Sequence, residues 1–212
     1  MANTTLDTIL NAVKFRVVRD DITDAEYVQR INWAMKDFCR LEIPELEKSG
    51  SFALSDSTTT YSLPSSLYTI ISMRNASQDY ALKPVTFEEW SEYDHNEEGE
   101  PEIYSRFGYS GDYPQVHLFP TPDSDIAGET IVYRYYAIPT EGSASSLSTS
   151  IDLTPIYDEA IVARSCYKIF RDTNEPERAS IANNDWKEAM AAVAARRAGE
   201  FRYTTRVVQG GS

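Results

Sequence analysis

Residues 23–38, TDAEYVQRINWAMKDF, combine the start signal of a helix with the apolar spacing of one helical face. Thr23 and Glu26 stand three positions apart, as in a capping box, where each side chain accepts a hydrogen bond from the other residue's backbone N–H. Behind this cap, apolar residues recur three or four positions apart: Tyr27, Val28, Ile31, Met35 and Phe38. The pattern predicts an amphipathic helix that reaches about Arg40, short of the boundary set by Pro44.

Both ends of the chain are predicted to be helical. Upstream of residue 23, one apolar stripe consists of Leu6, Ile9, Leu10, Val13 and Val17. Near the C-terminus, Thr154 and Pro155 mark a helix start, and residues 174–176 mark a break before a last helix that ends at Gly199. The apolar stripes of these two helices are Ala160, Ala163, Tyr167 and Phe170, and then Ala179, Ala182, Trp186, Ala189, Met190 and Val193. Because two helices alone bury little apolar surface, residues 1–50 and 154–198 are predicted to share one bundle.

The middle of the chain, residues 51–140, has a different character. β-Branched and aromatic residues gather in short runs separated by Pro, Gly, Asn and Asp, which predicts five to seven short strands in an antiparallel sandwich or barrel. Residues 86–93 interrupt the strands with a short helix capped by Thr86. The serine-rich residues 141–153 predict a flexible linker, and residues 199–212 an extended arm.

The predicted fold class is therefore α+β. Helices and strands are segregated along the chain rather than alternating, which argues against a parallel βαβ sheet. We expect a helical bundle formed by the N- and C-terminal helices, with an inserted antiparallel β domain and an extended C-terminal arm.

The composition excludes several classes of function. The 212 residues hold 33 Asp and Glu against 20 Lys and Arg, and this net charge of −13 disfavours a protein that grips DNA phosphates. Cys39 and Cys166 form no CxxC pair and cannot build a Cys/His zinc site. His95 and His117 are interpreted as surface or edge residues. No nucleotide-binding or hydrolase motif occurs, so we predict no enzyme, no catalytic residues, no metal site and no cofactor.

Two charged segments are candidate interaction sites. Eight acids, with no Lys or Arg among them, form the first: Glu88, Glu89, Glu92, Asp94, Glu97, Glu98, Glu100 and Glu102. They predict a solvated loop, or a surface that faces a DNA path or a basic partner. From residue 196 onward the charge is basic and apolar residues alternate with polar ones, which predicts an arm that docks on a neighbouring protein. Its candidate docking residues are Phe201, Arg202, Tyr203, Arg206, Val207 and Val208.

Four short motifs, together with the N-terminal helix pair, carry a resemblance to a known family. They are YSLP at residues 61–64, GEPEIY at 99–104, LFPTPD at 118–123 and LTPIYDEA at 153–160. The chain resembles the head-to-tail connector adaptor proteins of tailed bacteriophages. In chains of this kind a proline-terminated strand opens a β insertion, and the glycine-proline and proline-rich motifs follow within it.

The resemblance implies a structural role in the neck of the virion. It implies a homo-oligomeric ring of about twelve copies below the portal, an arm that docks on the portal protein, and contact with the next tail component, a nozzle or stopper. Genomic DNA would pass through the channel without specific binding. No membrane contact is implied, and the protein would be made in the host cytoplasm.

Three alternatives remain open on the sequence alone. The chain could form another ring of the tail, such as a stopper or nozzle. Its tyrosine-rich β segment could instead stack on sugars, as in a carbohydrate-binding module. A hydrolase acting through carboxylates is the third alternative, although no spacing singles out a pair of acids.

Overall fold

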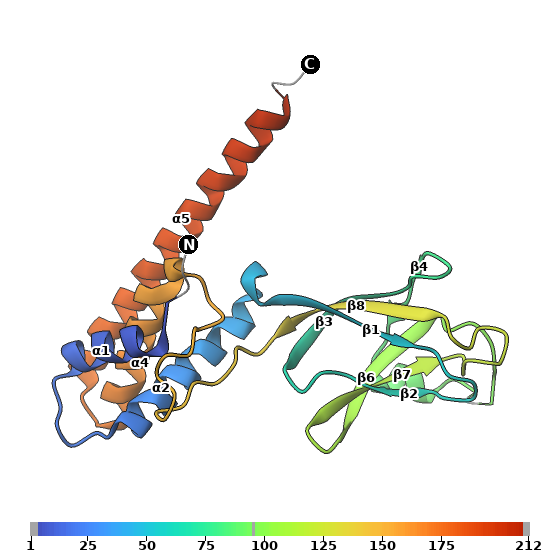
Figure 1. Cartoon of the computed structure of the whole chain (residues 1–212), viewed down its shortest axis with the longest axis horizontal. Helices are drawn as coiled ribbons and strands as arrows, with labels where there is room; N and C mark the ends of the chain where they lie inside the picture. Colours follow the sequence, from blue (N-terminus) through green and yellow to red (C-terminus); the bar gives the residue numbers. More distant parts are fainter. Residues whose placement is uncertain (1–3, 95, 210–212) are drawn as a thin grey trace. The chain divides into compact units, whose positions relative to one another are not determined.

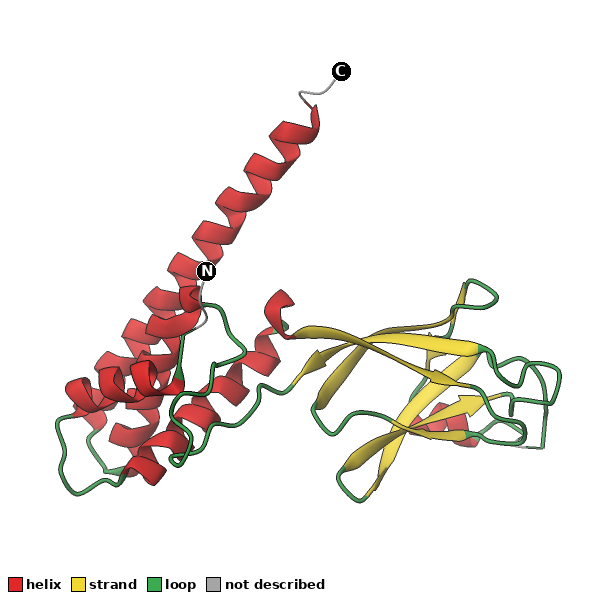
Figure 2. Ribbon diagram, viewed as in Figure 1, coloured by secondary structure: helices red, strands yellow, loops and turns green. Residues whose placement is uncertain are grey.

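The computed structural model describes residues 4–94 and 96–209, with side chains as far as Ala198. The chain divides into two compact units, which we call the helical unit (Met1–Leu41 with Pro139–Ser212) and the β unit (Glu42–Ile138). Figure 1 shows them in the colours of the sequence, and Figure 2 by secondary structure. Helices at both ends of the chain and a β-rich segment between them confirm the predicted α+β class.

The helical unit contains α1 (Leu6–Val17), α2 (Asp24–Asp37), the 3-10 turns η1 (Phe38–Leu41) and η3 (Pro155–Tyr157), α4 (Asp158–Asp172) and α5 (Pro176–Gln209). The β unit contains the 3-10 turn η2 (Pro44–Leu46), β1 (Glu47–Ala53), β2 (Thr60–Ser62), β3 (Leu67–Asn75), β4 (Tyr80–Ala81), β5 (Lys83–Pro84), α3 (Phe87–Ser91), β6 (Ile103–Ser110), β7 (Tyr113–Phe119) and β8 (Thr130–Ala137).

α4 is the central helix of the helical unit, since α1, α2 and α5 all pack against it. Its buried residues extend around much of its circumference: Ala160, Ile161, Val162, Ala163, Ser165, Cys166, Ile169 and Phe170. The predicted stripe of α1 is entirely buried. Both hydrogen bonds of the capping box are present, since the Glu26 amide donates to the Thr23 hydroxyl at 3.3 Å and the Thr23 amide donates to the Glu26 carboxylate at 2.8 Å.

The end of α2 differs slightly from the prediction. The α-helix ends at Asp37 rather than near Arg40, and the chain tightens into η1 over Phe38–Leu41. Helix ends commonly tighten in this way because the last carbonyls lack partners within the α-helix. Phe38 stays buried in η1, so the apolar stripe continues past the end of the α-helix.

The β unit is built from two four-stranded sheets, in the orders β1-β8-β3-β4 and β2-β7-β6-β5. Paired strands are antiparallel except β5 and β6, which run parallel. A buried cluster draws side chains from both sheets: Leu54, Tyr61, Leu63, Leu67, Met73, Leu82, Tyr104, Val116, Leu118, Ile131, Tyr133, Tyr135 and Ala137. The Phe52 ring packs against this cluster and stacks on Tyr61, with the ring centroids 4.4 Å apart.

The eight strands among the described residues exceed the five to seven predicted. β4 coincides with a predicted run at residues 80–82, whereas β5 has only two residues, too few to give an alternating pattern. β1 begins at Glu47, in a polar stretch, because its backbone pairs with β8 along its whole length. Gly50 in β1 is required there, since a Cβ atom at this position would run into the ring of Tyr133 on β8. The short helix predicted over residues 86–93 is α3, and its Thr86–Glu89 capping box is present.

The segment 141–153 is not the flexible linker that its composition predicts. Its carbonyls at Thr149 and Leu147 accept hydrogen bonds from the backbone amides of Leu6 and Asp7, each at 2.9 Å. Asn32 of α2 also exchanges two hydrogen bonds of 2.9 Å with the backbone of Gly142. The first amides of a helix have no partner within the helix, and this segment supplies partners for two of them in α1.

The predicted extended arm is also wrong over residues 199–209. α5 does not end at Gly199 but continues as a helix to Gln209. The ten residues before Gly199 include six alanines, the strongest helix formers. One glycine in a helix costs only about 1 kcal/mol relative to alanine, and no proline follows to block propagation.

A cluster of charged residues joins α2 to α4. Asp37 accepts a hydrogen bond from Arg164 Nε at 2.7 Å, and its carboxylate lies 2.9 Å from Lys168 Nζ. The three side chains are between 12% and 20% exposed. Burial would raise the pKa of Asp37, but hydrogen bonds from Lys168 and Arg164 outweigh it and lower the pKa below its ordinary value. The carboxylate therefore stays charged and fixes the position of α2 on α4.

We predict that Asp37→Ala lowers the free energy of unfolding of the helical unit by about 2–3 kcal/mol, because it leaves two cations half-buried without their partner. The matched control is Glu159→Ala, which removes the more exposed Arg16–Glu159 pair in the same unit and should cost less than about 1 kcal/mol. Chemical denaturation followed by circular dichroism measures both. Equal losses in the two variants would contradict the role given to Asp37.

Candidate interaction surfaces

Two kinds of reactive site, metal-ligand clusters and exposed thiols, are absent from the described residues. No group of three or more His, Cys, Asp or Glu side chains among them is placed to hold a metal ion. Cys39 and Cys166 are both buried, and burial raises the pKa of both thiols, that of Cys166 to about 11. A thiol with a raised pKa is a poor nucleophile at neutral pH. Within the same part of the chain, no helix has the length and hydropathy that crossing a bilayer requires.

His117 lies on β7, on the face opposite to Val116 and Leu118, as the alternation predicts. Its ring stacks on Phe107 at 3.7 Å between centroids and meets the edge of Trp90 at 5.4 Å. The two ring nitrogens lie 3.0 Å from the Thr60 hydroxyl and 3.2 Å from the Phe107 carbonyl. The interpretation as a surface or edge residue is therefore wrong, because β7 lies between β2 and β6 and α3 packs over the ring. His95 lies outside the described residues.

Burial of the His117 ring lowers its pKa, opposed by the hydrogen bond with the Phe107 carbonyl. The neutral ring accepts at one nitrogen and donates at the other, which suits a hydroxyl on one side and a carbonyl on the other. His117 thereby joins β2, β6 and α3. With both nitrogens engaged, it is a structural residue of the β unit rather than a base for a substrate.

The eight acids of residues 88–102 form what we call the acidic strip. All eight are exposed, and in the described part of the chain none of them forms an ion pair. Glu89 accepts the Thr86 amide at 2.9 Å and so caps α3. Backbone hydrogen bonds hold the rest of the strip to the end of β7: Gly99 to Thr121 at 2.8 Å, Thr121 to Glu97 at 3.0 Å and Glu102 to Phe119 at 2.9 Å. The strip is thus an anchored surface whose charges face solvent.

The six candidate docking residues all lie on the last turns of α5, and their side chains lie outside the described part. Positions 202 and 206 are one turn apart on this helix, as are positions 203 and 207. The packed part of α5 comes earlier, where Ala179, Ala182 and Val193 are buried. Arg197 lies over the Tyr157 ring at 5.3 Å. Figure 1 shows the end of α5 running past the other helices of the helical unit.

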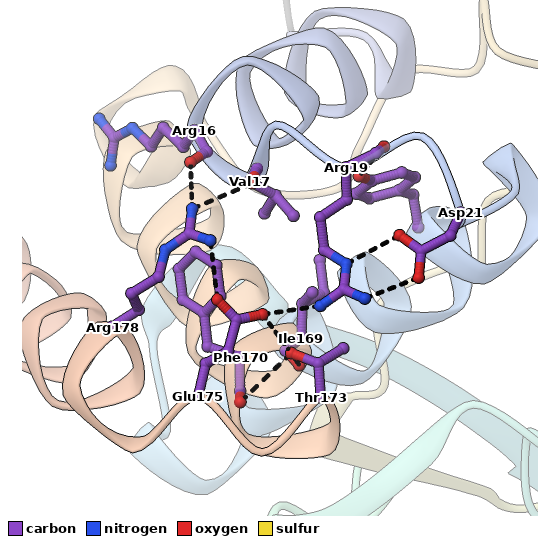
Figure 3. Close-up of polar contacts among 10 residues, drawn as sticks. Arg16, Val17, Arg19, Asp21, Ile169, Phe170, Thr173, Glu175 and Arg178 are labelled. Atoms are coloured by element: carbon purple, nitrogen blue, oxygen red, sulfur yellow. Dashed lines mark hydrogen bonds and ion pairs between the residues drawn. The ribbon is translucent and has the colours of Figure 1, made fainter.

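A network of arginines and acids fixes the start of α5 (Figure 3). Glu175, in the turn before α5, accepts from Arg178 at 2.8 Å and from Arg19 at 2.7 Å. Arg178 also donates a hydrogen bond to the Val17 carbonyl at 3.0 Å, and so provides a donor for the last carbonyl of α1. Arg19 in turn donates two hydrogen bonds to the Asp21 carboxylate, at 2.8 and 2.6 Å. The network binds the α4–α5 turn to the α1–α2 connection and thereby sets where α5 begins.

No pattern in the sequence predicts this network, although the network positions the helix that carries the docking candidates. Arg19 lies 156 positions from Glu175 in the chain, and no motif links it to Glu175 and Arg178. Hydrogen bonds from Thr173 and Arg178 lower the pKa of Glu175, so its charge persists below the pH at which a free glutamate is neutralised.

We predict that Glu175→Gln lowers the melting temperature of the helical unit at neutral pH, because it removes the anion shared by two arginines. The pKa of Glu175 is lowered in the folded state, so its contribution is present above the ordinary pKa of 4.5 and is lost as the pH falls through the lower folded value. The melting temperatures of the wild type and Glu175→Gln should therefore converge as the pH is lowered from 7 to 3. Glu177→Gln, an exposed acid in the first turn of α5, is the control. A similar fall in the melting temperature of Glu177→Gln would contradict the specific role of Glu175.

A second prediction concerns His117. Because burial lowers its pKa, the folded β unit prefers the neutral ring, and stability should fall as the pH drops below the ordinary value of 6.5. The His95→Gln variant contains a single histidine, so its ring proton signals in nuclear magnetic resonance report His117 alone. The titration midpoint should lie below 6.5. A midpoint at or above this value would show that the ring is not held in the buried stack.

Residues 4–210 match the model of a family described as SU10 adaptor protein. No curated protein matches. The match covers α1, the whole β unit and α5, and it agrees with the resemblance to phage adaptor proteins carried by the four motifs. This chain belongs to the SU10 adaptor protein family.

Proposed function

We propose that this protein is a structural connector in the neck of a bacteriophage virion. About twelve copies form a ring that joins the portal to the tail and leaves a channel for DNA. The observation that carries the proposal is the family match over residues 4–210, which spans both units and α5. The role is one of assembly rather than catalysis, and the engaged nitrogens of His117 and the raised pKa values of the cysteines are in keeping with it.

The end of α5 is the proposed portal-docking element. Residues 199–209 continue α5 past Val193, the last buried residue among the described side chains of this helix. Docking on the portal would bury the apolar side chains of this stretch. Phe201, Tyr203, Val207 and Val208 provide the apolar positions of this stretch, and Arg202 and Arg206 the basic ones.

The acidic strip is proposed to face the DNA channel or the next tail component. Cationic groups bind DNA because each neutralised phosphate releases counterions. A surface of exposed carboxylates repels the phosphates instead, so DNA can slide past it. A ring structure with the strip on the outer rim would exclude the channel-facing version of this proposal.

The docking role of α5 is tested by truncating residues 199–212. Val193 is the last buried residue of α5 among its described side chains, so the truncated chain should keep its circular dichroism spectrum and melting temperature. It should lose binding to the portal, measured by native mass spectrometry of mixtures with purified portal. The full-length chain should form a ring of about a dozen copies on the portal.

The control for the truncation is removal of residues 210–212 alone, which should leave portal binding intact. Unchanged portal affinity in the longer truncation would overturn the docking role of α5. A full-length chain that forms a ring but binds only a tail protein would assign it to a stopper or nozzle instead.

A further inference from the structure

β1 is an edge strand whose outer side faces no other strand. It lies at the end of the sheet β1-β8-β3-β4, so only β8 pairs with it. The other edge strands of the two sheets, β2, β4 and β5, have two or three residues each, and β5 contains Pro84. β1 has seven residues, no proline and an unbroken register with β8. An edge strand that is neither short, bulged nor interrupted by proline is a template for pairing with another strand.

The hydrogen bonds around the end of β1 show which of its backbone groups point outward. The Leu54 amide donates to the Glu129 carbonyl, just before β8, at 2.8 Å. Thr130, the partner of Ala53 in the register, instead accepts from the Ala76 amide on the β3 side, also at 2.8 Å. Backbone groups of successive residues point alternately to the two edges of a strand. The residues whose amides and carbonyls point away from β8 are therefore Glu47, Ser49, Ser51 and Ala53.

The described part of the chain leaves these outward groups open. Ser49, Ser51 and Ala53 are exposed, and their amides and carbonyls form no hydrogen bond there outside the ladder with β8. Their side chains are small, which leaves room for the side chains of an incoming strand. A row of free donors and acceptors at this spacing fits an extended polypeptide strand, which presents the complementary groups at the same spacing.

β1 is complementary to a second copy of itself. Its outward residues are symmetric about Gly50, so two antiparallel β1 strands with Gly50 opposite Gly50 align every outward residue of one copy with an outward residue of the other. In this register no two like charges face each other, which would be unfavourable. The other facing pairs are Glu47 with Ala53, Lys48 with Phe52, and Ser49 with Ser51.

We infer that the free protein forms a twofold dimer in which the β1 strands of two copies pair antiparallel about Gly50. The contact joins the two four-stranded sheets into one continuous sheet. The stem of Lys48 covers the partly buried Phe52 ring of the other copy, with its ammonium group over the ring. Glu47 keeps its ion pair with Arg134 of its own chain, so the dimer leaves no acid of β1 unpaired.

The symmetry of this contact separates it from the proposed ring. A contact between identical surfaces closes at two copies, whereas a single ring of equivalent copies needs two different surfaces on each copy. The dimer is therefore a form of the free protein. It protects the open edge of β1 from unrelated strands until the chain meets its partners in the virion.

The first experiment measures amide hydrogen exchange in β1 by nuclear magnetic resonance, on the wild-type chain without portal, at high and low concentration. The amides that bond to β8, those of Lys48, Gly50 and Phe52, should be protected at both concentrations. The amides of the outward residues 49, 51 and 53 should exchange at least about tenfold more slowly at the high concentration.

Two outcomes of this experiment would overturn the inference. One is fast exchange of the outward amides at every concentration, together with sedimentation of the chain as a monomer throughout. The other is protection that appears only when portal is added, since a strand of the portal would then be the occupant of the edge.

Ser51→Pro tests the backbone hydrogen bonds directly. It removes an outward amide that no bond within the chain uses, so the melting temperature should stay close to that of the wild type. Because both copies carry the change, dimerisation measured by sedimentation should need at least about tenfold higher concentration. Ser51→Ala keeps the amide and is the matched control. Equal dimerisation of the two folded variants would contradict pairing through β1.

The register is tested by mixing Ser49→Cys with Ser51→Cys under oxidising conditions. Position 49 faces position 51 of the other copy, so a disulfide should join unlike chains, and Cys39 and Cys166 are buried and should not compete. Disulfides that form as readily within either variant alone would overturn the register about Gly50. These experiments use the chain without portal, apart from the one portal addition, so a chain that never dimerises leaves the proposed ring function untouched.

Discussion

α4 has side chains on several of its sides that must be buried, and the arrangement of the helical unit follows from that requirement. Eight of its residues are buried, too many for a single neighbouring helix to cover. The N-terminal segment supplies α1 and α2, and the C-terminal segment supplies α5. Each fully buried Val, Leu, Ile or Phe side chain contributes about 1.5–3 kcal/mol, so both ends of the chain gain by meeting at α4. The residues between them are left to fold as a separate β unit.

The hydrophobic effect is not directional, so polar contacts fix the positions at which the other helices pack against α4. Asp37 ties α2 to α4 through two cations. Glu175 and its arginines tie the start of α5 to the end of α1. α5 is therefore held at its beginning and along its buried alanines, while its last turns continue beyond the other helices of the unit.

The features assigned to assembly use residues that the two cores do not need. The acidic strip is anchored through its backbone, which leaves its carboxylates toward solvent. A protein whose function is to contact neighbours is expected to carry such surfaces, because the contacts that they form lie outside the single folded chain.

Local patterns along the chain were sufficient to predict the α+β class, both capping boxes and the buried stripe of α1. Capping and helical periodicity act over a few residues, so they are visible in the sequence. The sequence also indicated where charge gathers, in residues 88–102 and after residue 196. It did not indicate the two-residue strand β5, which exists only because β6 pairs with it.

The remaining features depend on contacts between segments far apart in the chain. Serine-rich residues 141–153 are ordered because the amides of α1 need acceptors, and His117 is half-buried because α3 packs over its sheet. The same holds for the charged networks around Asp37 and Glu175. Such contacts join residues that no local motif relates, so only the folded chain brings them together.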